Sequence, residues 1–250
     1  MSHALEPIPT KSRPAAPNRD RSLGRLIWYR AVQAIVTVLL SAFYGLRATG
    51  RKNLPANGAA LLVSNHLSHL DSFILGILLP RPLNYVARST LFVPGVGAFI
   101  RSLGGFPIQR EGLGASGMKE TLRRLRAGGI VALFPEGTRS LDGELGEIKP
   151  GIALIAARAK VPIVPTAIAG TFEAWPRRRL LPTPHPIRIH FGTPISVEEI
   201  GSLSSEAVTE LIRSRLIECQ QAARTGLAGD LGSGRSGVGG SRTFGYSPPD

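Results

Sequence analysis

The stretch GGIVALFPEGTRS, residues 128–140, places a polar turn directly after a short apolar run. The apolar run, Ile130–Phe134, predicts a buried strand, and Pro135 predicts where that strand ends. Similar short runs recur along the chain, with helical patterns between them. Strands that alternate with helices predict an α/β fold with a mostly parallel central sheet flanked by helices.

The other elements follow from the same patterns of apolar residues. Strands are predicted at Ala59–Ser64, Leu83–Ala87, Gly105–Gln109, Val161–Ala169 and Ile187–Phe191. Helices are predicted at Ser68–Leu79, Leu91–Leu103, Ile152–Ala159 and Ser205–Arg224, and from Ser116 to a stop at Gly128. Ligands of such sheets bind beyond the carboxyl ends of the strands, so the polar residues that follow the strands are the candidates for function.

Composition divides the chain into four parts. Residues 1–22 are rich in proline and basic residues and predict a disordered arm. Residues 23–52 predict a membrane-associated helix, and residues 53–225 predict the folded domain. Residues 226–250 are rich in glycine and serine and predict a disordered tail, because this composition cannot repay the entropy of ordering.

The most apolar segment is Ile27–Leu46, which predicts an amphipathic N-terminal helix with one narrow polar stripe. The stripe recurs every three or four residues and comprises Arg30, Gln33, Thr37, Ser41 and Tyr44. The uncharged run Ala31–Leu46 has 16 residues, which is about 24 Å of helix against a hydrocarbon core of about 30 Å. We therefore expect a helix that lies in the membrane interface, with a tilted span and a buried core helix as alternatives.

The first polar cluster, Asn65-His66-Leu67-Ser68-His69-Leu70-Asp71, follows the first predicted strand. Ser68 and Asp71 are spaced as in a capping box at a helix start, which places His66 in the turn before the helix. A chain that reverses there brings the Asp71 carboxylate to one imidazole nitrogen and leaves the other nitrogen open, as in a general base with its orienting acid.

Two other interpretations of this cluster remain open. In the first, Asp71 serves only to cap the helix and His66 is an ordinary turn residue. A metal site built from His66, His69 and Asp71 has no further ligand at a suitable spacing, so we predict no metal.

The second cluster, Phe134-Pro135-Glu136-Gly137-Thr138-Arg139-Ser140, forms the turn after the Ile130–Phe134 strand. Gly137 permits a tight turn with exposed backbone N–H groups, and Arg139 adds a positive charge, so the turn suits an anion. An ordinary surface loop is the alternative. Arg110 at a strand end and Lys149 before a helix are further candidates for binding a phosphate.

The charge, the cysteine content and the absence of two common motifs limit the classes of function that the chain can have. The formal net charge is +13, and arginines number 25 of the 30 basic residues, which predicts a polyanionic partner such as a phosphorylated substrate, an anionic membrane or nucleic acid. The single cysteine, Cys219, excludes an internal disulfide and a cysteine zinc cage. The chain contains neither a P-loop nor a Gly-x-Ser-x-Gly elbow, which argues against nucleotide hydrolysis and a serine nucleophile.

In combination, four blocks resemble the glycerolipid acyltransferase family, the family of bacterial 1-acylglycerol-3-phosphate acyltransferases. They are Asn-His-x-Ser-x-x-Asp at 65–71, Gly-x-x-x-Ile-x-Arg at 104–110, Phe-Pro-Glu-Gly-Thr-Arg-Ser at 134–140 and Val-Pro-Ile-Val-Pro at 161–165. The chain departs from the family at Leu67, where glutamine is frequent, at Arg88, where lysine is frequent, and at Pro107.

The resemblance implies transfer of a fatty acyl group from an acyl-CoA or acyl-carrier-protein thioester to a glycerolipid hydroxyl, with no cofactor beyond that co-substrate. His66 would be the general base and Asp71 its orienting acid, without an acyl-enzyme. Glu136 and Gly137 would bind the acceptor, with Thr138 beside them. The expected place of action is the cytoplasmic face of the cell membrane, with the protein bound peripherally or monotopically.

The alternatives are the same chemistry on glycerol-3-phosphate or another lysolipid, and a non-catalytic module that binds an anionic membrane or nucleic acid through arginine. Aromatic residues make up 6% of the chain and do not alternate with the arginines, so binding to single-stranded nucleic acid is poorly supported. No nucleic-acid partner is expected.

Overall fold

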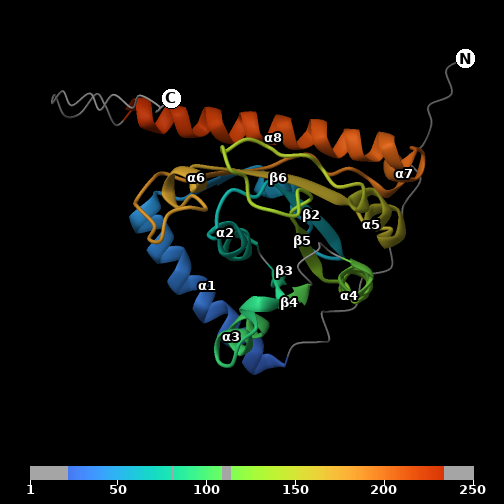
Figure 1. Ribbon diagram of the computed structural model, residues 1–250, viewed down its shortest axis with the longest axis horizontal. Helices are drawn as coiled ribbons and strands as arrows, with labels where there is room; N and C mark the ends of the chain where they lie inside the picture. Colours follow the sequence, from blue (N-terminus) through green and yellow to red (C-terminus); the bar gives the residue numbers. More distant parts are fainter. Residues whose placement is uncertain (1–21, 80, 109–113, 234–250) are drawn as a thin grey trace, which may run out of the picture.

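The computed structural model describes residues 22–79, 81–108 and 114–233. Their central feature is a seven-stranded sheet in the order β1-β7-β6-β2-β5-β3-β4 (Figure 1). The strands are β1 (Arg47–Thr49), β2 (Ala60–Ser64), β3 (Leu83–Arg88), β4 (Gly105–Ile108), β5 (Ile130–Leu133), β6 (Ile163–Ala169) and β7 (Arg188–Phe191). Neighbouring strands are parallel except for the β6–β7 pair, which confirms the mostly parallel sheet.

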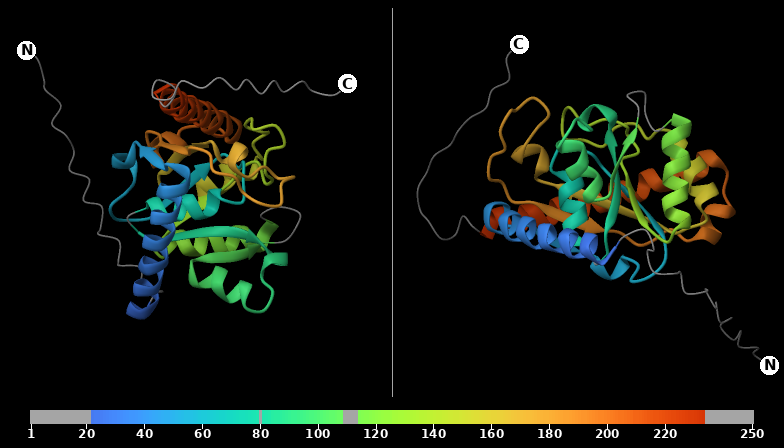
Figure 2. Two further views of the ribbon diagram at one scale, coloured as in Figure 1. Left: turned by 90° about the vertical axis from the view of Figure 1, so that its left-hand side faces the viewer. Right: turned by 90° about the horizontal axis from the view of Figure 1, so that it is seen from below.

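Helices cover both faces of the sheet, as the alternating pattern predicts (Figures 1 and 2). The helices are α1 (Leu23–Tyr44), α2 (Asp71–Leu78), α3 (Val96–Ser102), α4 (Gly114–Arg126), α5 (Gly151–Ala159), α6 (Thr171–Ala174), α7 (Val197–Gly201) and α8 (Ser205–Ser233). Alternate residues of β2 point to opposite faces: Leu62 belongs to an apolar cluster that includes residues of α1, α2 and α3, whereas Leu61 belongs to a cluster that includes residues of α4, α5, α7 and α8. The sheet therefore separates two apolar cores.

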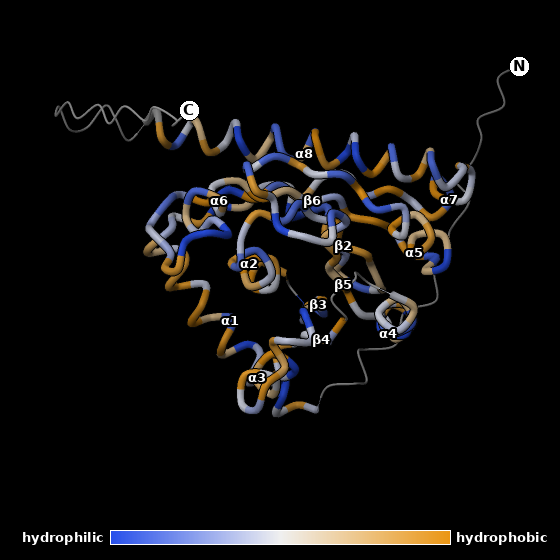
Figure 3. Tube along the Cα trace, viewed as in Figure 1, coloured by the Kyte–Doolittle hydropathy of each residue, from blue (hydrophilic) through white to orange (hydrophobic). Residues whose placement is uncertain are grey.

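Helix α1 contacts the domain along one side and exposes apolar side chains on the other. Tyr29 and Leu40 are buried in the core, whereas Ile35 is 61% exposed and Val38 is 67% exposed. Figure 3 shows the apolar character of this helix along most of its length. It is the one helix among the described residues that is long and apolar enough to cross a membrane. A fully buried core helix, one of the sequence alternatives, is therefore excluded for α1.

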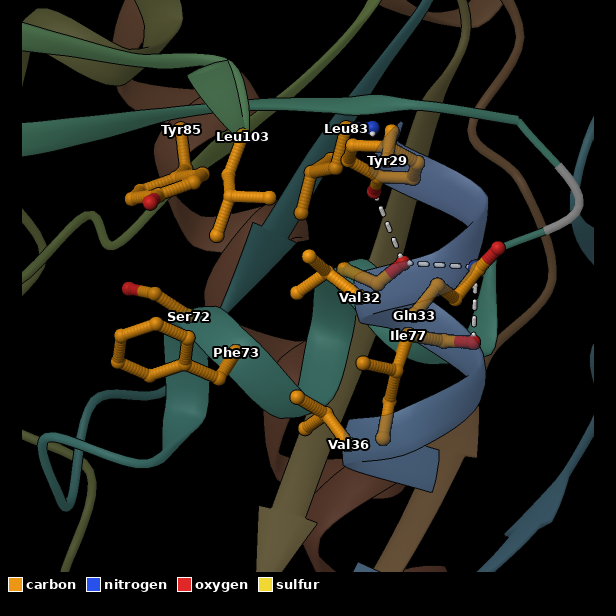
Figure 4. Close-up of a pocket in the computed structure, with 11 residues that line it drawn as sticks. Tyr29, Val32, Gln33, Val36, Ser72, Phe73, Ile77, Leu83, Tyr85 and Leu103 are labelled. Carbon is orange, nitrogen blue, oxygen red and sulfur yellow. Dashed lines mark hydrogen bonds between the residues drawn. The ribbon is translucent and has the colours of Figure 1, made fainter. Parts of the chain in front are cut away.

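The polar stripe of α1 includes a residue that faces the protein. The Gln33 side-chain amide donates hydrogen bonds to the carbonyl oxygens of Gly76, Ile77 and Leu79 at 3.2, 3.0 and 2.9 Å. The Tyr29 hydroxyl donates to the same Gly76 oxygen at 3.1 Å (Figure 4). These carbonyls lie at the C-terminal end of α2, where helix oxygens lack intrahelical donors. Helix α1 therefore caps α2.

Two predicted boundaries differ from the structure. The predicted membrane segment 23–52 includes β1, which pairs with β7 in the sheet, and a three-residue strand has too little pattern to be recognised in a sequence. The last helix continues to Ser233 instead of ending at Arg224, so residues 226–233 of the predicted disordered tail are helical. Burial of Leu227 against Ala169 offsets the entropy lost when these residues become ordered. The 1–21 part of the predicted arm and the 234–250 part of the predicted tail lie outside the described residues.

Candidate active site

The candidate site lies where four parallel strands end. β2 pairs with β5 on one side and with β6 on the other, and β3 pairs with β5. The residues that follow these strands therefore meet at one edge of the sheet. They include His66 after β2, Glu136 and Arg139 after β5, Arg88 at the end of β3 and Trp175 shortly after β6.

His66 and Asp71 are in contact, as their spacing predicts. The His66 Nδ1 atom lies 2.8 Å from Asp71 Oδ2. The Asp71 side chain is fully buried, and the His66 side chain is 20% exposed. The His66 ring also stacks on Phe134, with ring centroids 4.0 Å apart and an interplanar angle of 15°. The imidazole is thus held by a carboxylate at Nδ1 and by an aromatic ring on one face.

The Asp71 carboxylate also fixes the turn that carries His66. Asp71 Oδ2 accepts hydrogen bonds from the backbone N–H groups of Leu67 and Ser68, each at 2.7 Å. The N-cap position is Leu70, which makes no side-chain cap, so the predicted capping box does not form. The helix begins at Asp71, later than the predicted Ser68 start, and the Ser68 hydroxyl donates to the Trp175 carbonyl oxygen at 2.9 Å. The same carboxylate therefore holds the turn before the helix and contacts His66.

Glu136 ties the histidine turn to the turn after β5. Its two carboxylate oxygens accept hydrogen bonds from the backbone N–H groups of His66 and Gly146, both at 2.8 Å. The Ser140 N–H group adds a second tie by donating to the His66 carbonyl oxygen at 2.7 Å. Burial raises the pKa of Glu136, which is 5% exposed. This geometry favours a positioning role for Glu136 over the predicted direct contact with the acceptor.

Arginines gather beside the dyad. Burial lowers the pKa of Arg139, and the nearby positive charges of Arg177 and Arg88 lower it further, while the Asp71 charge acts in the opposite direction. The Arg139 Nη1 atom is buried and has no hydrogen-bond partner among the described residues. The same charges of Arg139 and Arg88 contribute to a lowered pKa of His69, for which burial is the largest cause. Within the described ranges none of these three guanidinium groups is paired with a carboxylate, and guanidinium groups in this state suit a multiply charged anion.

The remaining residues that the sequence predicted for the site differ in where they lie. Thr138, Arg139 and Lys149 line one surface pocket with about 730 Å³ of empty space open to solvent. Lys149 is paired with Glu147 at 3.1 Å, which reduces its attraction for a substrate phosphate. The Gly137 N–H group closes the turn by donating to the Phe134 carbonyl oxygen. Arg110 lies outside the described residues.

Neither Arg88 nor Arg177 was assigned to the site from the sequence. The signal for Arg88 was its position at the end of a predicted strand. Its nearness to Arg139 depends on the pairing of β3 with β5, and strand order is not visible in a single sequence. Within the described ranges, no group of three or more His, Cys, Asp or Glu side chains is arranged to hold a metal ion.

Comparison with known proteins gives a consistent result. Residues 45–169 match the model of the family described as "Acyltransferase". The chain is 29% identical over 198 residues to the 1-acyl-sn-glycerol-3-phosphate acyltransferase of Bacillus subtilis, covering 77% of this chain and 96% of that protein. It is 31% identical over 183 residues to the chloroplastic LPAT1 of Arabidopsis thaliana, covering 71% of this chain and 51% of that protein.

The fold has a solved counterpart. The crystal structure of the 1-acyl-sn-glycerophosphate acyltransferase PlsC from Thermotoga maritima superposes with a TM-score of 0.68. The two chains are 24% identical, and the match covers 86% of this chain and 84% of the other. The site is thus a histidine–aspartate pair at the carboxyl edge of an α/β sheet. Both residues of the pair lie within the half of the chain that matches the family model. The chain belongs to the acyltransferase family.

Proposed function

We propose that the protein transfers a fatty acyl group from a coenzyme A or acyl-carrier-protein thioester to the free hydroxyl of 1-acylglycerol-3-phosphate, giving phosphatidate. The observation that carries the proposal is the His66–Asp71 contact beside the cluster of Arg88, Arg139 and Arg177. A base next to a site for a phosphate fits an acceptor that carries both a hydroxyl and a phosphate. The names of the Bacillus and Arabidopsis relatives support this acceptor.

In the proposed reaction His66 is the general base. Its Nδ1–H group donates to Asp71, so the Nε2 atom carries the lone pair that removes the hydroxyl proton. The substrate oxygen attacks the thioester carbonyl carbon, and the resulting tetrahedral intermediate collapses with cleavage of the carbon–sulfur bond. The thiolate leaves with the proton from the imidazolium, which restores His66. Asp71 stabilises the imidazolium while it exists, and no acyl-enzyme forms.

The arginines hold the acceptor in this proposal. Arg139 offers a buried, unpartnered Nη1 atom, and Arg88 and Arg177 contribute charge from two neighbouring segments. Charge-assisted hydrogen bonds to a phosphate monoester would relieve the mutual repulsion of the three groups. The phosphate then fixes the acceptor so that its hydroxyl meets His66, and such positioning supplies much of the rate of a two-substrate reaction.

We propose that the reaction takes place at the cytoplasmic face of a membrane, because its acceptor is a lipid and the family resemblance implies this location. The outer side of α1 supports interfacial binding, since its large apolar residues are exposed while its inner side contacts α2. A helix of this kind lies at the level of the headgroups and keeps the domain at the surface.

The base is tested by His66→Ala, with His69→Ala as the matched control. We expect His66→Ala to lower kcat at least about a thousandfold, because both proton transfers lose their carrier. His69→Ala removes a neighbouring imidazole that contacts Trp175 and should retain at least about a third of the activity. Comparable activity in His66→Ala and the parent would rule out the proposed mechanism.

The acceptor is tested with a panel of lysophosphatidate, glycerol-3-phosphate and monoacylglycerol, each offered with one labelled acyl thioester and followed by mass spectrometry. Lysophosphatidate should be the preferred acceptor. Arg139→Gln should raise its KM about 10- to 100-fold, the loss of one or two charge-assisted hydrogen bonds, and should not change the slow reaction of monoacylglycerol. Equal losses for both acceptors would show that Arg139 does not bind the phosphate.

A further inference from the structure

Residues 175–186, which we call the arginine loop, connect α6 to β7 and carry an exposed pair of leucines near the middle of the loop. Leu180 is 91% exposed and Leu181 is 74% exposed, the two highest values among the large apolar side chains of the described residues. Exposing two adjacent leucines to water is unfavourable, and contiguous apolar exposure is typical of contact sites. The pair is not explained by the catalytic proposal.

The base of the loop is held by hydrogen bonds. The Trp175 indole N–H donates to the Arg179 carbonyl oxygen at 3.0 Å, and Arg179 donates to the Thr183 hydroxyl at 2.7 Å. The Thr183 N–H group donates to the Ala174 carbonyl oxygen at 2.8 Å. The loop therefore presents Leu180 and Leu181 in a defined position, so less ordering entropy is lost when a partner binds.

The loop is also attached to the catalytic turn. Trp175 accepts the hydrogen bond from the Ser68 hydroxyl, and its ring lies against His69 with centroids 5.4 Å apart. Ser68 and His69 directly follow the His66 turn, so whatever binds the loop lies beside the dyad.

Charge and apolar residues on the loop together favour one kind of partner. Arg177, Arg178 and Arg179 immediately precede the leucines, and residues 175–186 contain no acidic residue. An acidic protein would be matched by the arginines alone. An anionic bilayer matches both features, because cationic side chains meet the headgroups while apolar side chains enter the acyl boundary.

The loop lies on the same side of the molecule as α1. In Figure 1 the loop projects beyond α6 near the C-terminal end of α1. In the view from below in Figure 2 both lie toward the left of the molecule, the loop at its upper edge and α1 at its lower edge. We infer that the arginine loop is a second membrane contact, which inserts Leu180 and Leu181 into an anionic bilayer while α1 lies in the same interface. This inference rests on the proposed interfacial binding of α1. Two separated contacts fix the orientation of the catalytic edge relative to the bilayer.

The test uses an environment-sensitive nitrobenzoxadiazole label on a single introduced thiol. Labels are placed at Leu181→Cys on the loop, at Val38→Cys on the outer side of α1 and at Leu203→Cys, a control site that is 39% exposed between α7 and α8. Cys219 is buried and does not compete for the label. With vesicles of phosphatidylglycerol and phosphatidylcholine, the labels at 181 and 38 should shift to the blue, and the label at 203 should not.

A second measurement compares vesicle binding of the unlabelled full-length proteins. Leu180→Ser combined with Leu181→Ser should weaken partitioning to these vesicles about tenfold. Leu203→Ser should have no effect, and Arg178→Gln should weaken binding to anionic but not to zwitterionic vesicles.

The outcomes separate this inference from the proposed function. A shift at 38 without a shift at 181 would refute the loop contact and leave the interfacial helix in place. A shift at 181 produced by an acidic acyl carrier protein, but not by vesicles, would likewise overturn the inference in favour of a protein partner. No shift at either position would refute interfacial binding itself, while the acyl transfer assays would be unaffected.

Discussion

Asp71→Asn is expected to remove most activity while retaining the fold. Asp71 is fully buried and its partner His66 is 20% exposed, so an effective dielectric constant of about 20 applies to their interaction. Opposite charges about 4 Å apart then attract by about 4 kcal/mol. This attraction exists only while His66 carries the proton taken from the substrate. Its loss raises the barrier by that amount and lowers kcat about a thousandfold.

The assay is kcat and KM for lysophosphatidate with a saturating acyl thioester, together with thermal unfolding. The asparagine carbonyl can still accept the backbone N–H groups of Leu67 and Ser68, so stability should fall by only about 1–3 kcal/mol. Asp142→Asn is the matched control, because this exposed carboxylate also caps a turn but does not contact His66, and its activity should stay within about twofold. If Asp71→Asn remains folded and retains more than about a tenth of parental kcat, the charge argument is refuted.

Three further outcomes concern stability and reactivity. Hydrogen bonding from Arg123 lowers the pKa of Glu120 from 4.5 to about 2, so its stabilising effect is complete above pH 4.5 and is lost as the pH falls toward 2. Glu120 is about one-third exposed, so its contribution is small. In urea titrations over that pH range, the free energy of unfolding of the parent should fall by about 1 kcal/mol more than that of Glu120→Gln. Gly170→Ala should lower the free energy of unfolding by at least about 2 kcal/mol, since Gly170 has a φ of 92° and an added Cβ would collide with the Pro186 carbonyl oxygen; an unchanged denaturation midpoint would contradict this. Burial raises the pKa of Cys219 to about 12, so a thiol reagent at about pH 8 should react only after denaturation, and rapid labelling of the native protein would count against the fold near β6.

The central strands were predictable because their residues are buried on both sides of the sheet. β2 and β5 read as continuous apolar runs, and each ends at a polar cluster that terminates the pattern. β1 was not predictable, because its pairing with β7 brings together residues more than a hundred positions apart. The end of α8 was also missed. Its glycines suggest disorder, but Asp230 forms ion pairs with Arg47 and Arg188, which no local pattern reveals.

The site was predictable where its contacts are local. His66 and Asp71 are five residues apart, and the turn between them leaves few other arrangements. The role of Glu136 was not predictable, because its partners, the N–H groups of His66 and Gly146, come from loops that only the folded sheet brings together. The arginine cluster was missed for the same reason, since it combines a residue at the end of β3 with residues from two loops.

The way Gln33 closes the end of α2 affects how this enzyme can be handled. A membrane anchor is often cut away to obtain a soluble catalytic domain. In this protein, removal of α1 would leave the peptide oxygens of Gly76, Ile77 and Leu79 without their donor, at the far end of the same helix that begins with Asp71. Purification should therefore keep α1 and shield its outer side with detergent or lipid nanodiscs. If a protein without α1 lost activity, the loss could come from the uncapped end of α2, so it would not show that the bilayer is needed.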